Sequence, residues 1–243
     1  TGGRAQYWFN DHVKVGLTAS HAEEEDIDND LYGSDITFRK SAETWIKVEA
    51  GRSEGAGAFI SNSIDGGYDF DTPVFLESSD VEAWAYSVDA SVGLKDVLDL
   101  GRGRFTLYYR DVGAGYLAPG LVTDRDTTQY GGTVTVPVLN WLNLHLKGDR
   151  SEQQDGLDTT AAEFDVSARF LTNWSLSTGV RHDTREDNSF NVPPTQVEGD
   201  RTDAILQLEY DSLARWKAYS FVQGSIQTTG NRDDNFRVGT GGS

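Results

Sequence analysis

Strict alternation of apolar and polar residues constrains the fold of this chain more than any other feature. Residues 142–147 read Leu-Asn-Leu-His-Leu-Lys, so leucine occupies every second position. Because successive side chains of a β-strand point to opposite faces, this segment predicts a strand with one apolar and one polar face. The same period-two pattern recurs in segments near residues 13–19, 46–51, 84–92, 104–110, 133–138, 164–170, 174–181 and 204–210.

Weaker alternation adds candidate strands at residues 4–9, 31–39, 216–227 and 235–241. The total is about thirteen strands of roughly nine to eleven residues, a length that suits a tilted strand crossing a bilayer. Strands of soluble sheets are usually shorter, about five or six residues. The pattern therefore predicts an all-β fold, an antiparallel transmembrane β-barrel built as an up-and-down meander.

The predicted connections alternate between short and long along the chain. Outer-membrane barrels have this arrangement, with short turns in the periplasm and long loops outside the cell, whereas soluble sandwiches mix loop lengths at both ends. Short turns are expected at 10–11, 41–43, 94–103, 139–140, 171–173 and 211–215, and long, polar, acidic extracellular loops at 20–30, 52–80, 112–127, 149–160, 183–201 and 228–234.

Tryptophan gives an independent indication of a membrane boundary, because five of the six tryptophans lie beside the predicted short turns. An indole at this boundary keeps its ring among acyl chains and its N–H near water, so aromatic residues collect in girdles. A soluble core would not gather these residues at one end of the strands. The predicted girdle residues are Trp8, Trp45, Trp141, Trp174 and Trp216.

Composition excludes several classes of protein and site. A net charge of −18 repels phosphate backbones, so we expect no nucleic-acid partner. The absence of cysteine removes disulfides and thiolate sites. No apolar run approaches the ~20 residues of a membrane-spanning helix, and barrel strands escape that test because only alternate residues face lipid. We expect residues 1–243 to form a single barrel segment.

Charged residues on the predicted polar faces are the best candidates for a functional surface. An unpaired charge in a dry medium is very costly, so charges on an inner face indicate water or ion pairs inside the barrel. Two interpretations stay open, a ladder of structural ion pairs and a pore lining that sets selectivity. The lumen-facing candidates are Lys14, Arg39, Lys47, Glu49, Asp89, Arg104, Arg110, Lys147, Asp165, Arg169, Arg181 and Glu209.

The number and direction of the predicted strands indicate a larger barrel. If the short turns are periplasmic, the first and last strands both run inward from the outer side, and the strand count is odd. Complete bacterial barrels usually have an even number of strands and both termini in the periplasm. We therefore expect these residues to be a contiguous section of a larger barrel.

Several stretches resemble a known group of proteins, namely residues 30–35 (DLYGSD), 48–55 (VEAGRSEG), 108–116 (YYRDVGAGY) and 177–183 (STGVRHD). They resemble the barrel region of large proteobacterial outer-membrane proteins, a surface-repeat and porin-like group in which a long repeat-bearing surface region accompanies the barrel. The resemblance implies barrel architecture and the outer membrane of a Gram-negative bacterium. It implies no reaction and no particular solute.

The acidic segment at residues 22–30 has the alternate-acid spacing of a calcium loop. It lacks the glycine at the sixth position and the glutamate at the twelfth that such loops use. We expect no resident cofactor, and two interpretations of the segment stay open, a solvated loop and a weak Ca²⁺ site. The candidate ligands are Asp26, Asp28 and Asp30.

Two histidines raise catalytic alternatives. His145 and Asn143 share a polar face, as do a histidine and an asparagine of outer-membrane phospholipase, but the sequence identifies no serine nucleophile. His182 and Asp183 lie at the outer end of a predicted strand, as in omptin-like proteases, and would need a second acidic pair across the mouth. We expect the chain not to be an enzyme.

Three functions remain, in order of expectation. The first is a pore or channel for passive or partner-assisted passage of solutes. The second is a barrel that anchors or translocates an adhesive or structural surface domain, and the third is an outer-membrane lipase or protease. The expected partners are the lipid bilayer and lipopolysaccharide, together with other outer-membrane or surface proteins.

Overall fold

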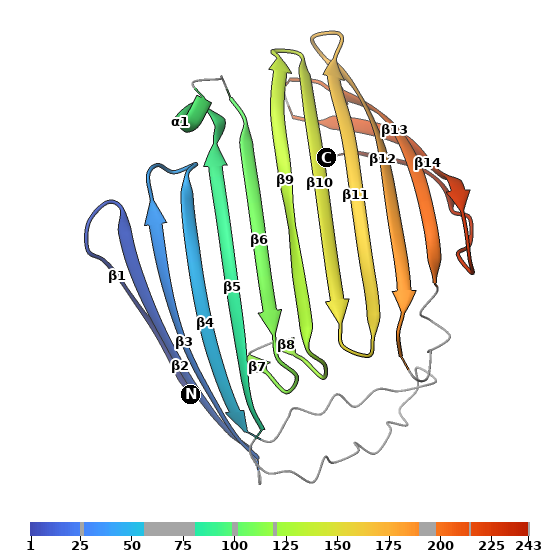
Figure 1. Ribbon diagram of the computed structural model, residues 1–243. Coiled ribbons are helices and arrows are strands. Elements are labelled where there is room, and N and C mark those ends of the chain that lie inside the picture. The colour runs from blue at the N-terminus through green and yellow to red at the C-terminus, as the bar shows by residue number, and fades with distance from the viewer. Residues whose placement is uncertain are drawn as a thin grey trace. The chain divides into compact units, whose positions relative to one another are not determined.

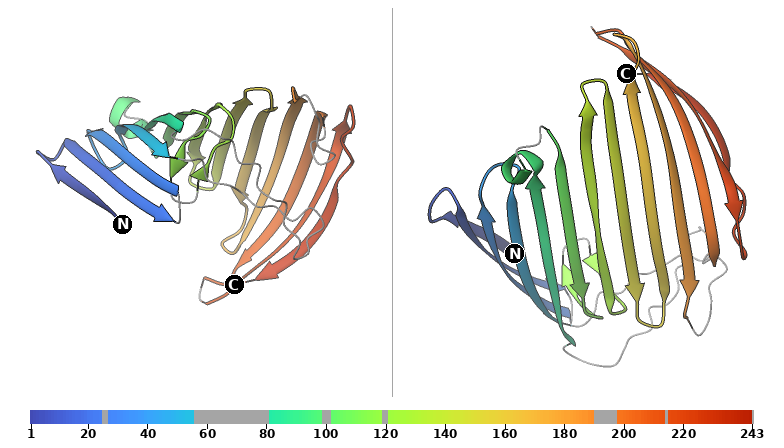
Figure 2. Two further views of the ribbon diagram at one scale, coloured as in Figure 1. Left: turned by 90° about the horizontal axis from the view of Figure 1, so that it is seen from below. Right: turned by 45° about the horizontal axis from the view of Figure 1, so that its top comes forward.

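The computed structural model describes residues 1–24, 27–55, 81–98, 102–118, 121–189, 198–213 and 215–242. Thirteen strands form one sheet in the order β1-β2-β3-β4-β5-β6-β9-β10-β11-β12-β13-β14-β15, so each strand lies beside its predecessor in this series (Figure 1). Figure 2 shows the same order from two further directions. This antiparallel up-and-down meander confirms the predicted all-β fold class and strand number.

The bounds of the elements follow the alternating segments of the sequence. The short strands β7 and β8 form a separate hairpin, and α1 is the only helix of the described residues. The elements are β1 (Gly2–Trp8), β2 (Val13–Glu24), β3 (Ile27–Arg39), β4 (Trp45–Gly55), β5 (Val81–Gly93), α1 (Leu94–Leu98), β6 (Arg104–Val112), β7 (Leu117–Ala118), β8 (Leu121–Val122), β9 (Thr127–Leu139), β10 (Leu142–Gln153), β11 (Leu157–Arg169), β12 (Trp174–Asp187), β13 (Gly199–Asp211), β14 (Lys217–Thr228) and β15 (Phe236–Gly242).

The prediction of long loops at residues 20–30 and 149–160 is wrong, because the strands on either side extend into these segments. β2 and β3 stay paired as far as Glu24 and Ile27. β10 continues to Gln153 and β11 starts at Leu157, so this connection is tight. Both extensions are mostly polar and have no regular apolar face, and a period-two pattern cannot distinguish such a segment from a loop.

The chain divides into two compact units. The first unit comprises residues 1–38, 47–88 and 110–127, and the second comprises residues 39–46, 89–109 and 128–243. The sheet order has two ends, β1 and β15, and no pairing joins these strands within the described ranges. No helix in this part of the chain combines the length and the apolar character needed to span a membrane.

Strand register gathers the apolar side chains of the second unit on one face. Leu144 pairs with Val166, Val166 with Thr178, and Leu206 with both Thr178 and Val222. Residues opposite each other in an antiparallel pair point to the same side, so this row crosses five strands on a single face. Leu206, in its middle, is 47% exposed.

The described residues have almost no buried apolar core. Ala83 and Tyr116 are the only buried hydrophobic residues among them. Large apolar side chains such as Leu17, Leu146 and Phe164 are exposed instead. A soluble domain of this size buries most of its large apolar side chains, so the arrangement is inverted relative to a soluble fold.

The short helix α1 holds the connection between β3 and β4 in place through hydrogen bonds, and both segments belong to the second unit. Ser41 Oγ and Thr44 Oγ1 each donate a hydrogen bond of 2.5 Å to Asp96 Oδ2, and Lys40 Nζ donates to the Asp96 carbonyl at 2.9 Å. These hydroxyl donors hold the pKa of the Asp96 carboxyl below its ordinary value. The connection at residues 94–103 was expected to be a plain turn, and α1 was not predicted.

Candidate functional site

The polar face of the second unit carries a regular array of ion pairs. Lys147 lies opposite Glu163, Glu163 opposite Arg181, and Arg181 opposite Asp203, so charges alternate in sign across β10–β13. Arg181 Nη1 lies 3.2 Å from Glu163 Oε2. Arg201 Nε lies 3.1 Å from Asp203 Oδ2. Opposite charges that face each other across strands stabilise the sheet and keep this face hydrophilic.

The loop between β14 and β15 adds a buried cation to this face. Arg232 Nη1 donates to Asp183 Oδ2 at 2.7 Å, and Arg185 Nε lies 3.5 Å from the same oxygen. The second terminal nitrogen of Arg232, Nη2, is buried without a hydrogen-bond partner. The loop is therefore tied to β12 by a shielded ion pair.

A cavity of about 230 Å³ opens on the same polar face. Its lining contains two arginines of this face, Arg181 and Arg185, against two acids, Asp149 and Asp183. Arg150 also borders the cavity, although its side chain alternates onto the other face of β10. Tyr108 also lines it and donates its hydroxyl to Asp149 Oδ1 at 2.7 Å. Guanidinium, carboxylate and hydroxyl groups around one hollow suit a small polar solute better than an apolar one.

Two glycines make room for carboxylates that reach across a strand. A Cβ on Gly16 would overlap the Asp35 carboxylate, and a Cβ on Gly179 would overlap Asp165 Oδ1. Across the first of these glycine notches, Asp35 Oδ2 accepts a hydrogen bond of 2.6 Å from Arg4 Nη2. The Asp35 side chain is only 2% exposed, so the notch allows a shielded ion pair between β1 and β3.

The connection between β6 and β9 folds onto the polar face of the first unit; we call residues 113–118 and 121–126 the inner loop. Its Tyr116 is buried, and a Cβ on Gly51 would overlap the Tyr116 hydroxyl. The Leu117 amide donates to Ser53 Oγ at 3.0 Å. Burial raises the pKa of the Tyr116 phenol, with a smaller contribution from Glu49.

Several of the predicted lumen-facing residues form ion pairs. These pairs are Lys47–Glu49, Arg104–Glu43 at 4.0 Å, Lys147–Asp149 at 3.1 Å, Arg181–Glu163 at 3.2 Å and Glu209–Lys217 at 3.9 Å. Lys14 lies over the ring of Trp8, 5.5 Å from its centroid. Arg39, Asp89, Arg110 and Arg169 lie on β3, β5, β6 and β11. Neither Arg232 nor Tyr116 was predicted, because both lie outside the alternating segments.

The predicted tryptophan girdle divides into two groups. Trp174, Tyr210 and Trp216 form an aromatic cluster with ring centroids 5.0 and 5.1 Å apart. Trp8 pairs in register with Lys14 and therefore lies on the polar face, where the girdle prediction does not hold. Alternation along β4 places Trp45 on the face of Lys47.

Trp141 lies in the β9–β10 turn and is half exposed. The prediction fails for Trp8 and Trp45 because proximity to a turn shows at which end of a strand a tryptophan lies. It does not show on which face of the sheet the side chain lies. Tyr7 and Phe9 take the neighbouring positions to Trp8, and their rings meet edge to face at 5.1 Å.

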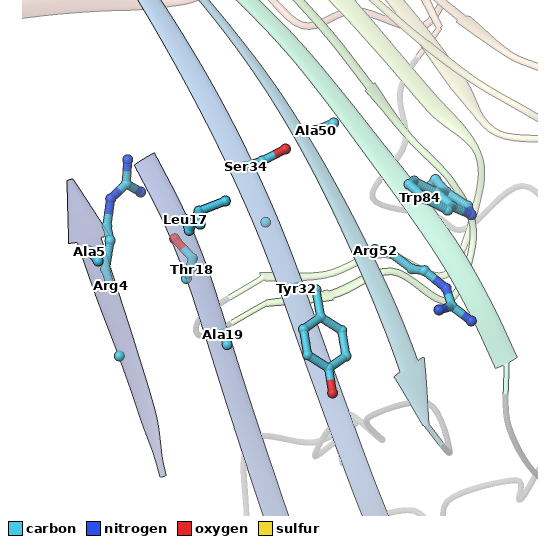
Figure 3. Close-up of a pocket in the computed structure, with 12 residues that line it drawn as sticks. Arg4, Ala5, Leu17, Thr18, Ala19, Tyr32, Ser34, Ala50, Arg52 and Trp84 are labelled. Carbon is cyan, nitrogen blue, oxygen red and sulfur yellow. The ribbon is translucent and has the colours of Figure 1, made fainter. Parts of the chain in front are cut away.

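A hollow of about 830 Å³ lies on the apolar face of the first unit (Figure 3). Leu17, Tyr32 and Trp84 line it, with small residues between them. Arg52 also lines it, and its Nε lies 2.9 Å from Glu82 Oε1. Trp84 donates its indole N–H to the same carboxylate oxygen at 3.1 Å, so the charges on this face are paired.

The geometry gives little support to a catalytic site or to a calcium site at the predicted residues. His182 pairs in register with Thr202, and Asp183 with Arg201, so these neighbouring side chains point to opposite faces and form no dyad. His145 Nδ1 lies 3.0 Å from Thr135 Oγ1. Of the calcium candidates, Asp26 and the side chain of Asp28 lie outside the described residues, and Asp30 pairs with His21 at 2.9 Å.

Comparison with known proteins gives distant likenesses among solved structures alone. No family model and no curated protein matches the chain. Among solved structures, a crystal structure of an outer membrane channel from Pseudomonas putida F1 is similar to 98% of this chain and 90% of that one. The TM-score is 0.44 and the sequence identity is 10%. A likeness at this level transfers neither a function nor a site to this chain.

Proposed function

We propose that this chain forms the wall of a water-filled channel for small polar solutes in the outer membrane of a Gram-negative bacterium. The inverted distribution of side chains carries the proposal. Large apolar residues such as Leu146 and Leu206 are exposed, while Asp183 on the opposite face is buried and ion-paired. Apolar side chains that face acyl chains and charged ones that face water are the arrangement of transmembrane barrels.

The character of the polar face supports the passage of solutes through a hydrated interior rather than packing against another apolar layer. Its charges are balanced by close partners, as between Arg181 and Glu163, and it holds a hollow lined by arginines and acids. Paired charges leave little net field, so such a wall suits uncharged polar solutes and small ions of either sign. In the first unit, the inner loop covers part of this face and would narrow the path.

In this proposal the apolar face contacts lipid, and residues 1–243 act as one barrel segment. The turns 9–12, 40–44 and 170–173 face the periplasm, and the opposite ends of the strands that they join face outward toward lipopolysaccharide. The aromatic cluster of Trp174, Tyr210 and Trp216 then lies at the periplasmic boundary, where indole N–H groups reach water.

Planar-bilayer recording tests the proposal. The purified protein should insert and give discrete conductance steps that scale with salt concentration, whereas a heat-denatured sample should give none. Stable insertion into lipid vesicles with no conductance would point instead to an anchor or translocator. A protein that stays monodisperse without detergent and does not bind vesicles would contradict the membrane proposal altogether.

A further inference from the structure

Three metal-ligating side chains converge on the polar face of the second unit. They are His145 on β10 and Glu163 and Asp165 on β11. One ligand atom of each lies within 4.8 Å of the ligand atoms of the other two. All three side chains are partly exposed, so solvent can reach them.

The backbone explains why these three side chains meet. His145 lies directly opposite Asp165 in the β10–β11 register, and Glu163 lies two residues from Asp165 on the same face. On the other side of Asp165, Gly179 leaves the space that a Cβ would fill against Asp165 Oδ1. Thr135 Oγ1, 3.0 Å from His145 Nδ1, holds the imidazole ring in place.

We propose that His145, Glu163 and Asp165 bind a divalent transition-metal ion such as Zn²⁺. One imidazole and two carboxylates are a donor set that suits Zn²⁺, with water completing the coordination. A hydrogen bond to a metal-binding histidine, of the kind that Thr135 supplies, fixes the orientation of its ring. This site is separate from the acidic segment at residues 22–30.

Two cations face the same cluster and limit its affinity. Arg181 Nη1 lies 3.2 Å from Glu163 Oε2, and Lys147 lies opposite Glu163 in register. Asp165 and His145 form no ion pair with either cation. A bound ion would therefore depend most on His145 and Asp165, while Glu163 divides its two oxygens between the metal and Arg181.

Calorimetric titration of the chelator-treated, detergent-solubilised protein with Zn²⁺ tests the proposal. We expect one ion per chain, and binding weakened by about tenfold or more in His145→Ala and in Asp165→Asn. His182→Ala is the matched control and should leave binding unchanged, since His182 lies on the opposite face of the sheet, where its Nδ1 is 2.9 Å from Thr202 Oγ1. Absence of Zn²⁺ binding, or equal weakening by His182→Ala, would overturn the proposal.

A second measurement uses the unaltered chain, so it does not depend on the folding of the variants. Zn²⁺ should slow modification of His145 by diethylpyrocarbonate several-fold and leave modification of His182 unchanged, as read by peptide mass spectrometry. Equal modification of His145 with and without Zn²⁺ would refute the site. Neither readout requires a conducting pore, so the site and the channel proposal can fail independently.

Discussion

Arg232 Nη1 lies 2.7 Å from Asp183 Oδ2, and the two side chains are only 3% and 8% exposed. This pair connects the β14–β15 loop to the polar face of β12. Removal of one partner from a shielded ion pair leaves an uncompensated charge, which costs more than the pair itself contributes. The contact therefore gives the most direct test of how the loop is held.

Arg232→Met should lower the free energy of unfolding by about 2 kcal/mol, less than in a dry core because Arg185 remains near Asp183. Urea unfolding in lipid vesicles measures the change. The matched control is Arg237→Met, since Arg237 is exposed and its Nε donates to the neutral Asn235 Oδ1 at 3.1 Å. Combining Arg232→Met with Asp183→Asn should recover part of the loss, and no recovery would argue against the pair as the cause.

Gly179→Ala should destabilise the sheet by about 1–3 kcal/mol, because the new methyl group overlaps Asp165 Oδ1 and must displace it. Gly148→Ala is the control, since the nearest atom to its Cβ is the Ala161 carbonyl oxygen at 4.0 Å. Unfolding midpoints of the two variants make the comparison. Equal midpoints would show that Asp165 does not occupy the notch.

Leu206→Arg should reduce stability in a bilayer by about 2–4 kcal/mol if this face meets hydrocarbon. Gln207→Arg, one residue along β13 on the opposite face, should cost much less because water reaches that side. Refolding equilibria in lipid vesicles compare the two substitutions. A larger loss of stability for Gln207→Arg than for Leu206→Arg would mean that the face of Gln207 contacts lipid. That result would remove the basis of the channel proposal.

Tyr116→Ala should raise single-channel conductance, because the side chain that holds the inner loop against Gly51 is lost. Tyr130→Ala provides the control, since Tyr130 is exposed on a strand of the second unit. Bilayer recordings of both variants should show the increase for Tyr116 alone. Unchanged conductance would mean that the inner loop does not narrow the path.

Asp96→Asn should lower the free energy of unfolding at neutral pH, and lower it by less near pH 2. Hydrogen bonds from Ser41 and Thr44 depress the pKa of the Asp96 carboxyl, so its contribution is complete above the unfolded-state pKa of about 4. The contribution disappears as the pH falls through the lower, folded-state value. Unfolding curves at both pH values measure this, with Asp124→Asn, on an exposed side chain, as the control.

The parts of the fold that could be predicted from the sequence are those where one face is apolar. The alternation of leucine in residues 142–146 predicts both the strand β10 and the face that Leu144 occupies, and the register confirms it. Where a segment has no regular apolar face the signal disappears, so the period-two pattern predicts a loop at the ends of β2 and β3. No local pattern indicates that the helical turn α1 fastens the β3–β4 turn.

Side-chain sites were predicted less completely than strands. Charged residues within segments of alternating apolar and polar residues, such as Lys147 and Arg181, could be placed on the polar face by periodicity alone. Burial of Arg232 depends on how a loop folds back over β12, and burial of Tyr116 depends on the inner loop, so neither follows from spacing. Convergence of His145, Glu163 and Asp165 requires the pairing of β10 with β11, which no single segment contains.

The glycine notches have a consequence for how the strands find their alignment. A slip of two residues preserves which face every side chain occupies, so apolar and polar alternation alone cannot reject it. Such a slip would move Asp35 away from Gly16, or Asp165 away from Gly179, and set each carboxylate against a residue with a side chain. The notches thus favour the native register over registers shifted by two residues, which the apolar and polar pattern alone does not exclude.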